Sequence, residues 1–307
     1  MNGLIDYAGL FPPAALELDE AITNYASYRT SEYAEMLSCF IIPSSRLTEL
    51  DAYSHLFSQK PPFVFSVLGG NPTGMDAYKK SIQTLVEQST AFVNKHGKNV
   101  VISVFEIKLP ELSGEKAFGQ VLNETIQTLS DAGFTDSQLF FEPVRNENWN
   151  QTCEALTNAL KKASIQKSAG FKLRCGGISA DLFPSIAEVA EAIYRTSSNG
   201  IALKATAGLH HPIRHFSKDV NTKMHGFFNV FGATILAGAH QLNQTQITDI
   251  LEDENPANFH FDDKRFAWKD FSIQLNELVN LRNQLATSYG SCSFDEPLDD
   301  LKALNLL

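Results

Sequence analysis

The chain has 307 residues, 43% of which are apolar, and a formal net charge of −10 at pH 7. This length suits one α/β barrel, for which roughly 250 residues is typical, better than two large domains. The acidic balance and the lack of a long basic run argue against nucleic acid as a partner.

Strand-like and helix-like segments alternate along most of the chain. Short apolar runs that end at Gly or Pro predict buried strands, and the amphipathic stretches between them predict helices. The predicted strands cover residues 3–10, 36–43, 63–68, 100–109, 139–143, 169–177 and 200–208. The predicted helices cover residues 18–29, 75–95, 115–131, 149–163, 184–198, 224–241 and 272–287.

Repeated parallel crossovers leave two architectures, an open doubly wound sheet or a closed barrel. No Gly-x-Gly-x-x-Gly follows the first strand, although dinucleotide-binding sheets usually carry one. Polar residues instead follow the ends of many strands, which is typical of a barrel. We therefore expect an α/β fold: a single TIM (β/α)8 barrel over residues 1–307. Residues 259–268 are its expected eighth strand, and residues 288–307 its C-terminal cap with a short helix.

Two segments of similar design carry the most distinctive residues. Lys172 and Arg174 stand two apart before Gly176, and Lys204 and Thr206 stand two apart before Gly208. Because residues two apart share a face of a strand, both lysines are expected to enter one cavity. Two lysines in a low-dielectric site depress each other's pKa, and a neutral amine is what an imine-forming nucleophile needs. The alternative is that both lysines simply reach solvent.

Three carboxylates are expected at the same end of the barrel. Asp6 follows Leu4 and Ile5 near the end of the first strand, Glu106 and Lys108 share a face at the end of the fourth, and Glu142 ends the fifth. A buried acid beside cations is a natural proton-transfer group or charge partner. The alternatives are a turn residue for Asp6 and a rim ion pair for Glu106 and Lys108.

Histidines cluster after the seventh strand, at His210, His211, His215 and His225. A spacing of i, i+4 could place two of them on one helix face, but no His-Glu-x-x-His pattern accompanies them. We therefore expect His210 and His211 to contact a substrate, and expect no metal. Arg174 and Arg214 are the expected anion-binding groups.

The cysteines, the start of the chain and its apolar runs indicate the expected compartment and partners. Four widely spaced cysteines without a Cys-x-x-Cys pair favour free thiols. No leader-like start and no apolar run near ~20 residues is found, so the expectation is a cytoplasmic protein without a membrane partner. The expected partner is a small-molecule substrate, with no cofactor; a homo-oligomer is compatible with the sequence.

With these residues in view, the chain resembles the deoxyribose-phosphate aldolase group of class I aldolases. Residues 4–12, with the acidic stretch 18–22, resemble that family's opening Ile-Asp-His-Thr-x-Leu-x-Pro. Gly-Phe-Lys at 170–172 resembles the segment with the imine-forming lysine, and Leu-Lys-Ala-Thr-Ala-Gly at 203–208 resembles the segment with the second lysine. The Lys-Ala-Thr-Ala-Gly-Leu-His-His run also resembles a separate bacterial family of barrel proteins.

The aldolase resemblance implies a lyase that forms a Schiff base with a small, anionic carbonyl compound. Lys172 would be the nucleophile, Lys204 the neighbour that lowers its pKa, and Glu106 a loose match to the proton-shuttling acid. The loops after both lysines depart from the family, which argues against deoxyribose phosphate as the substrate. The alternatives are a lyase or isomerase that uses lysine and histidine acid-base or metal chemistry without an imine, and a metabolite-binding barrel without chemistry.

Overall fold

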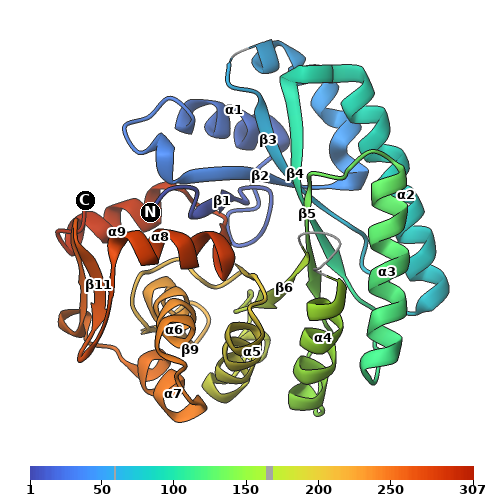
Figure 1. Cartoon of the computed structure of the whole chain (residues 1–307). Helices are drawn as coiled ribbons and strands as arrows, with labels where there is room; N and C mark the ends of the chain where they lie inside the picture. The colour runs from blue at the N-terminus through green and yellow to red at the C-terminus, as the bar shows by residue number, and fades with distance from the viewer. Residues whose placement is uncertain (59, 164–168) are drawn as a thin grey trace.

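The computed structural model describes residues 1–58, 60–163 and 169–307. Within these ranges, eight parallel strands close into a barrel in the order β1-β13-β7-β6-β5-β4-β3-β2, with helices around it (Figure 1). The chain is therefore an α/β TIM barrel, as its sequence predicts. The barrel strands are β1 (Ile5–Tyr7), β2 (Leu37–Pro43), β3 (Phe63–Leu68), β4 (Val100–Lys108), β5 (Gln138–Glu142), β6 (Ala169–Arg174), β7 (Leu203–Thr206) and β13 (Ala286–Ser291).

The helices lie close to their predicted positions, because each buries one apolar stripe against the barrel. The predicted bounds of α3 and α4 match the structure, and α9 is the short helix expected in the C-terminal cap, whereas α7 carried no expectation. The α-helices are α1 (Leu18–Tyr28), α2 (Met75–His96), α3 (Glu115–Asp131), α4 (Trp149–Ala163), α5 (Ile186–Asn199), α6 (Phe227–His240), α7 (Gln244–Glu252), α8 (Leu275–Gln284) and α9 (Asp295–Ala303). The 3₁₀ helices are η1 (Ala34–Met36), η2 (Ser44–Ser58), η3 (Gly97–Asn99), η4 (Ala180–Leu182) and η5 (Pro256–Asn258).

The predicted eighth strand is wrong. Residues 259–268 belong to a separate antiparallel sheet of β10 (Phe259–Phe261), β11 (Arg265–Trp268) and β12 (Phe271–Gln274), outside the barrel. The eighth barrel strand is β13, which pairs with β1 and β7 and overlaps the start of the expected cap. A second hairpin of β8 (His215–Ser217) and β9 (Thr222–Met224) lies in the chain between β7 and α6.

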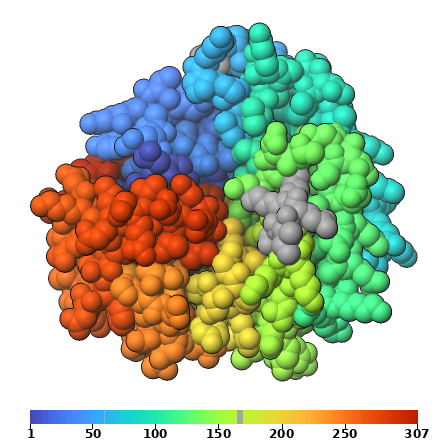
Figure 2. All heavy atoms as spheres, in the orientation of Figure 1, coloured from blue at the N-terminus to red at the C-terminus, as the bar shows by residue number. Residues whose placement is uncertain are grey.

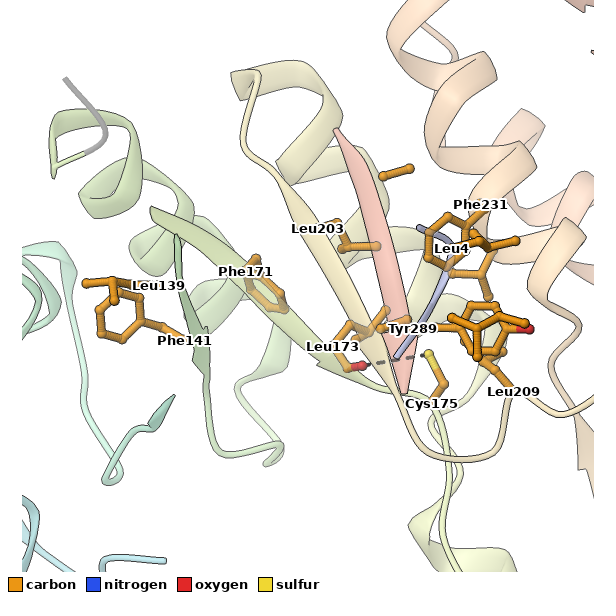
Figure 3. Packing of buried hydrophobic residues seen from close by; sticks show 14 of the residues in the cluster. Leu4, Leu139, Phe141, Phe171, Leu173, Cys175, Leu203, Leu209, Phe231 and Tyr289 are labelled. Atoms are coloured by element: carbon orange, nitrogen blue, oxygen red, sulfur yellow. Dashed lines mark hydrogen bonds between the residues drawn. The ribbon is translucent and has the colours of Figure 1, made fainter. Parts of the chain in front are cut away.

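Alternation along the strands divides the core into two layers. Phe171 and Leu173 on β6, Leu203 on β7 and Tyr289 on β13 are buried, and Figure 3 shows them among the apolar side chains of the cluster. Tyr289 stacks on Phe227 of α6 with ring centroids 5.2 Å apart. Because these residues face the helices, their neighbours in the sequence face the barrel interior.

Figure 2 shows the segment of α8, in orange-red, at the surface of the face drawn there. In the part of the chain that the structure describes, no helix is both long and apolar enough to cross a membrane.

Candidate functional site at the carboxyl end of the barrel

The two lysines lie side by side inside the barrel. Strands β6 and β7 pair in parallel with Lys172 opposite Lys204 and Arg174 opposite Thr206. Lys172 is 4% exposed and Lys204 is fully buried. The two side chains contact a common carboxylate, that of Glu106, but only Lys172 reaches the cavity described below, so the expectation that both lysines enter one cavity holds for Lys172 alone.

Lys204 lies at the bottom of this region, where the first and last barrel strands meet. Its ammonium donates to the Asp6 carboxylate and, over 3.0 Å, to the Ser288 hydroxyl. Ser288 donates in turn to Asp6 over 2.5 Å, and the backbone N–H of Cys39 donates to the other Asp6 oxygen over 2.9 Å. Asp6 is therefore a structural anchor for Lys204, in a fully buried cluster.

Glu106 connects the two lysines. One of its oxygens lies 2.9 Å from the Lys172 ammonium, and the other lies 3.6 Å from Lys204 and accepts a hydrogen bond of 2.6 Å from Ser66. Burial by itself would raise the pKa of Glu106, but attraction to Lys172 and Lys204 outweighs it and lowers the pKa to about 2. Glu106 is thus a carboxylate at neutral pH.

Glu142 completes the set on the other side of Lys172. Its two oxygens lie 2.8 Å from the Lys172 ammonium and 3.0 Å from Nε of Arg174. Burial opposes ionisation of Glu142, yet the two cations hold its pKa below the usual range. Arg174 itself is half exposed, so its guanidinium extends from this buried network toward the space above it.

The charge state of the lysines differs from the sequence-based expectation. Burial alone would lower the pKa of Lys172, but Glu106 and Glu142 outweigh it and raise the pKa above its ordinary value. The same balance, with Asp6 and Glu106 as partners, raises the pKa of Lys204. The carboxylates decide the outcome because each ammonium lies within 4 Å of two of them: Lys172 of Glu106 and Glu142, and Lys204 of Asp6 and Glu106. Both amines are therefore protonated at neutral pH.

A cavity of about 240 Å³ lies above this network, at the ends of the barrel strands. Lys172, Glu106, Arg174, Thr206 and His210 contribute its polar groups. The rest of its wall is mainly apolar and comes from several strand ends and loops: Ala8, Phe11, Pro12, Ile41, Leu68, Ile178, Leu182 and Ala207, with Gly177, Gly290 and Cys292. Asp6 and Lys204 lie beneath the cavity and do not line it.

The glycines after the two lysine strands bring their loops together. A Cβ atom on Gly176 would lie 2.9 Å from Cα of Gly208 and 2.5 Å from the Phe183 ring. Gly208 also has a φ of +70°, a conformation that side-chain-bearing residues rarely adopt. These two positions therefore require glycine, and the close contact fixes the cavity wall beside Arg174.

The histidine cluster is only partly at the cavity. His210 lines it and contacts Glu296 of α9 over 3.1 Å; His211 contacts Asp300 of the same helix. The rings of His211 and His215 are 4.2 Å apart, but the residues lie in a loop and in β8, so the expected shared helix face does not form. Burial opposes protonation of His210, but hydrogen bonds with Cys292 and Glu296 raise its pKa to about 9.

Three further expectations concern residues that lie elsewhere. Lys108 is not among the residues that line the cavity. Arg214 lines a separate cavity beside α5 and lies 3.9 Å from Glu254. His225 donates from Nε2 to the backbone oxygen of Pro184, and burial lowers its pKa to about 4. Within the described ranges, no group of three or more His, Cys, Asp or Glu side chains is arranged to hold a metal ion.

Sequence reasoning missed several partners of the charged groups. Ser66 and Ser288 each donate to a buried carboxylate of the network, and Glu296 and Asp300 hold the histidines from α9. Serine occurs too widely to mark a site, so only the register of the closed barrel shows these contacts. The inward position of residue 288 could have been found only if β13 had been recognised as a strand.

Comparison with known proteins identifies no family for the chain. No family model and no curated protein matches the chain. Among solved structures, it is similar to an intracellular xylanase from Thermoanaerobacterium saccharolyticum in complex with xylotriose. That match has 10% sequence identity and a TM-score of 0.45, and covers 96% of this chain and 88% of the xylanase chain. At these values the likeness concerns the barrel alone.

The interpretation as an aldolase-like lyase is therefore corrected. Neither family models nor curated proteins connect the chain to class I aldolases. The site also lacks the neutral amine on which a Schiff base depends, because Lys172 is held between Glu106 and Glu142. The expected mutual depression of the lysine pKa values was wrong because attraction to Asp6, Glu106 and Glu142 outweighs both burial and the repulsion between the two ammonium groups.

Proposed function

We propose that the cavity at the carboxyl end of the barrel binds a small organic acid that carries a second oxygen, such as a keto acid or a hydroxy acid. The observation that carries this proposal is that Arg174 and protonated Lys172 line the same small, mainly apolar cavity. Ligands of TIM barrels bind at this end, where the loops after the strands meet.

Arg174 is the group best placed to bind the acid. Its Nε is taken by Glu142, while its terminal nitrogens have no hydrogen-bond partner among the described residues. A guanidinium presents paired N–H donors that match the two oxygens of a carboxylate. Because the side chain is 47% exposed, an incoming acid can reach it without breaking the buried ion pairs.

Lys172 then faces the rest of the ligand. The network contains three carboxylates (Asp6, Glu106, Glu142) and three cations (Lys172, Lys204, Arg174). Because the Lys172 ammonium contacts both Glu106 and Glu142, it is fixed in place before a ligand arrives. A fixed ammonium in a water-poor site stabilises negative charge on a ligand oxygen. The role supported for Lys172 is therefore electrostatic, with Glu106 and Glu142 as positioning residues and His210 as a second polar contact.

The apolar wall sets the size and nature of the ligand body. The cavity of about 240 Å³ lies just under the range of ~300–1,000 Å³ that is usual for small-molecule sites. Pro12, Ile178 and Leu182 offer carbon surface and no hydrogen-bonding side chains. A short-chain acid fits this volume and these walls, whereas a polysaccharide does not.

Thermal unfolding with a panel of short-chain keto acids, hydroxy acids and their neutral amides tests this proposal. A ligand at about 100 times its Kd stabilises a protein by about 2.7 kcal/mol, which raises Tm by roughly 5 °C in a chain of this size. We expect acids, and not amides, to give such a shift, and Arg174→Gln to abolish it. The control is Arg195→Gln, which removes an arginine of α5 that pairs with Glu191 away from the cavity. Failure of every acid to bind, or an unchanged response in Arg174→Gln, refutes the proposal.

A further inference from the structure

A second cavity lies outside the barrel, between α6, α8 and the sheet β10–β12. It measures about 300 Å³, and its walls are largely aromatic and aliphatic. The lining residues that matter most are Phe231, Phe266, Leu278, Val279 and Arg282. Figure 3 shows Phe231 beside Leu4, which also lines this cavity.

Its position separates it from the site described above. Leu4 precedes β1, and Arg282 precedes β13, so the cavity reaches the amino-terminal ends of two neighbouring strands. The organic-acid site lies at the carboxyl ends of the strands. No residue lines both cavities. A ligand in one can therefore be distinguished from a ligand in the other by substitution.

Helix α8 covers this cavity loosely. Leu278 is the buried residue of α8, whereas Val279 is 50% exposed and Leu275 is 38% exposed, although both line the cavity. On the opposite wall, Gly232 of α6 lets the Phe266 ring approach, since a Cβ there would lie 2.6 Å from the end of the ring. The cavity is thus built closely on the side of α6 and is open along α8.

Arg282 is the one charged side chain among the described residues that line the cavity. Its guanidinium donates to the backbone oxygens of Ala286, Thr287 and, over 3.0 Å, Asn2. Within the described ranges no carboxylate forms an ion pair with it. Burial lowers its pKa to about 10, with only a distant attraction to Asp6 against this effect. A guanidinium carries five N–H donors, so these three acceptors leave two donors without a partner among the described residues.

We propose that this cavity is a binding site for an apolar chain or ring that ends in a carboxylate, with the carboxylate at Arg282. A partly buried cation without an anionic partner loses some of its hydration, and a ligand carboxylate offsets that loss while the apolar wall takes up the chain. The exposed apolar side chains of α8 close over the chain when it binds.

Calorimetric titration with octanoate, 1-octanol and octylammonium tests the proposal on the unmodified protein. Hydrogen bonds to a charged group are worth about 1.5–3 kcal/mol, so octanoate should bind at least roughly tenfold more tightly than 1-octanol. Octylammonium should not bind. Equal affinity for octanoate and octylammonium, or no saturable binding of octanoate, overturns the proposal.

Two variants locate the site. Val279→Trp places a large ring over the open side of the cavity and should weaken octanoate binding at least roughly tenfold, a loss of about 1.4 kcal/mol. Its matched control is Val101→Trp, at a valine that is 42% exposed and outside the cavity. Arg174→Gln should leave octanoate binding unchanged. Binding that is lost in Arg174→Gln and kept in Val279→Trp would place octanoate at the barrel mouth and refute the second site.

Discussion

Glu106→Gln is the perturbation that tests the charge network most sharply. The side chain is 2% exposed and lies 2.9 Å from Lys172 and 3.6 Å from Lys204. Its pKa falls from an ordinary 4.5 to about 2 in the folded protein. Because one pH unit of difference corresponds to about 1.4 kcal/mol, Glu106 contributes about 3 kcal/mol at pH 7. Removing one partner of a buried ion pair costs a similar amount, about 3–5 kcal/mol.

The expected result is a lower Tm for Glu106→Gln, by roughly 5–10 °C at pH 7. The sign of the pH dependence follows from the lowered pKa. Stabilisation by Glu106 is fully present above its unfolded pKa near ~4.3 and is lost as pH falls through about 2. The difference in free energy of unfolding between the unmodified protein and the variant should therefore shrink between pH 5 and pH 2 by most of its value at pH 7.

Urea unfolding from pH 2 to pH 7 measures this difference directly. The matched control is Glu154→Gln, which removes a carboxylate that is 53% exposed and 3.4 Å from Arg195. An exposed pair of this kind contributes about 0–1 kcal/mol, so the control should change little. Equal stability of Glu106→Gln and the unmodified protein at pH 7, or a difference that does not depend on pH, would refute the reasoning.

Three further predictions concern the lysines, His210 and Gly208. Borohydride reduction with small aldehydes and ketones, followed by peptide mapping, should leave Lys172 and Lys204 unmodified at pH 7, because both amines are protonated; an adduct on either would restore the imine mechanism. His210→Gln should lower the free energy of unfolding by less than about 1 kcal/mol, because its partner Glu296 is 43% exposed. Since the pKa of His210 is raised to about 9, this loss should be fully present below pH ~6.5 and disappear as pH rises through about 9. Gly208→Ala should lower both Tm and affinity for the organic acid, because its Cβ would lie 2.8 Å from a backbone atom; an unchanged affinity would show that this loop contact does not shape the cavity.

The strands with the lysines were predictable because their pattern is local. In β6, Phe171 and Leu173 face the helices while Lys172 and Arg174 face inward, so alternation alone fixes the orientation. The helices α3 and α4 were predictable for the same reason, since each has a long and regular apolar stripe.

The eighth strand was not predictable from its pattern. β13 reads Ala-Thr-Ser-Tyr-Gly-Ser, in which Ser288 and Gly290 face inward and interrupt any apolar run. The segment of β10 and β11 alternates more clearly, because one of its faces packs against α6 while it stays outside the barrel. A pattern of period two shows that a strand has a buried face, and does not show which sheet the strand joins.

The partners of the lysines depend on the closed barrel as a whole. The sequence predicts the three carboxylates (Asp6, Glu106, Glu142) at the same end as the lysines. The register across β1, β4, β5, β6 and β7 then determines which carboxylate contacts which ammonium. That register decides the sign of the Lys172 pKa shift, and a sequence does not contain it.

The most direct test of the account is a crystal structure of the protein with the keto acid or hydroxy acid that stabilises it most. We predict that the acid group lies within hydrogen-bonding distance of the terminal nitrogens of Arg174. The second oxygen should face Lys172, and the carbon body should lie against Leu182. An acid bound elsewhere with the barrel mouth empty would contradict the account, and so would a covalent bond between the ligand and Lys172.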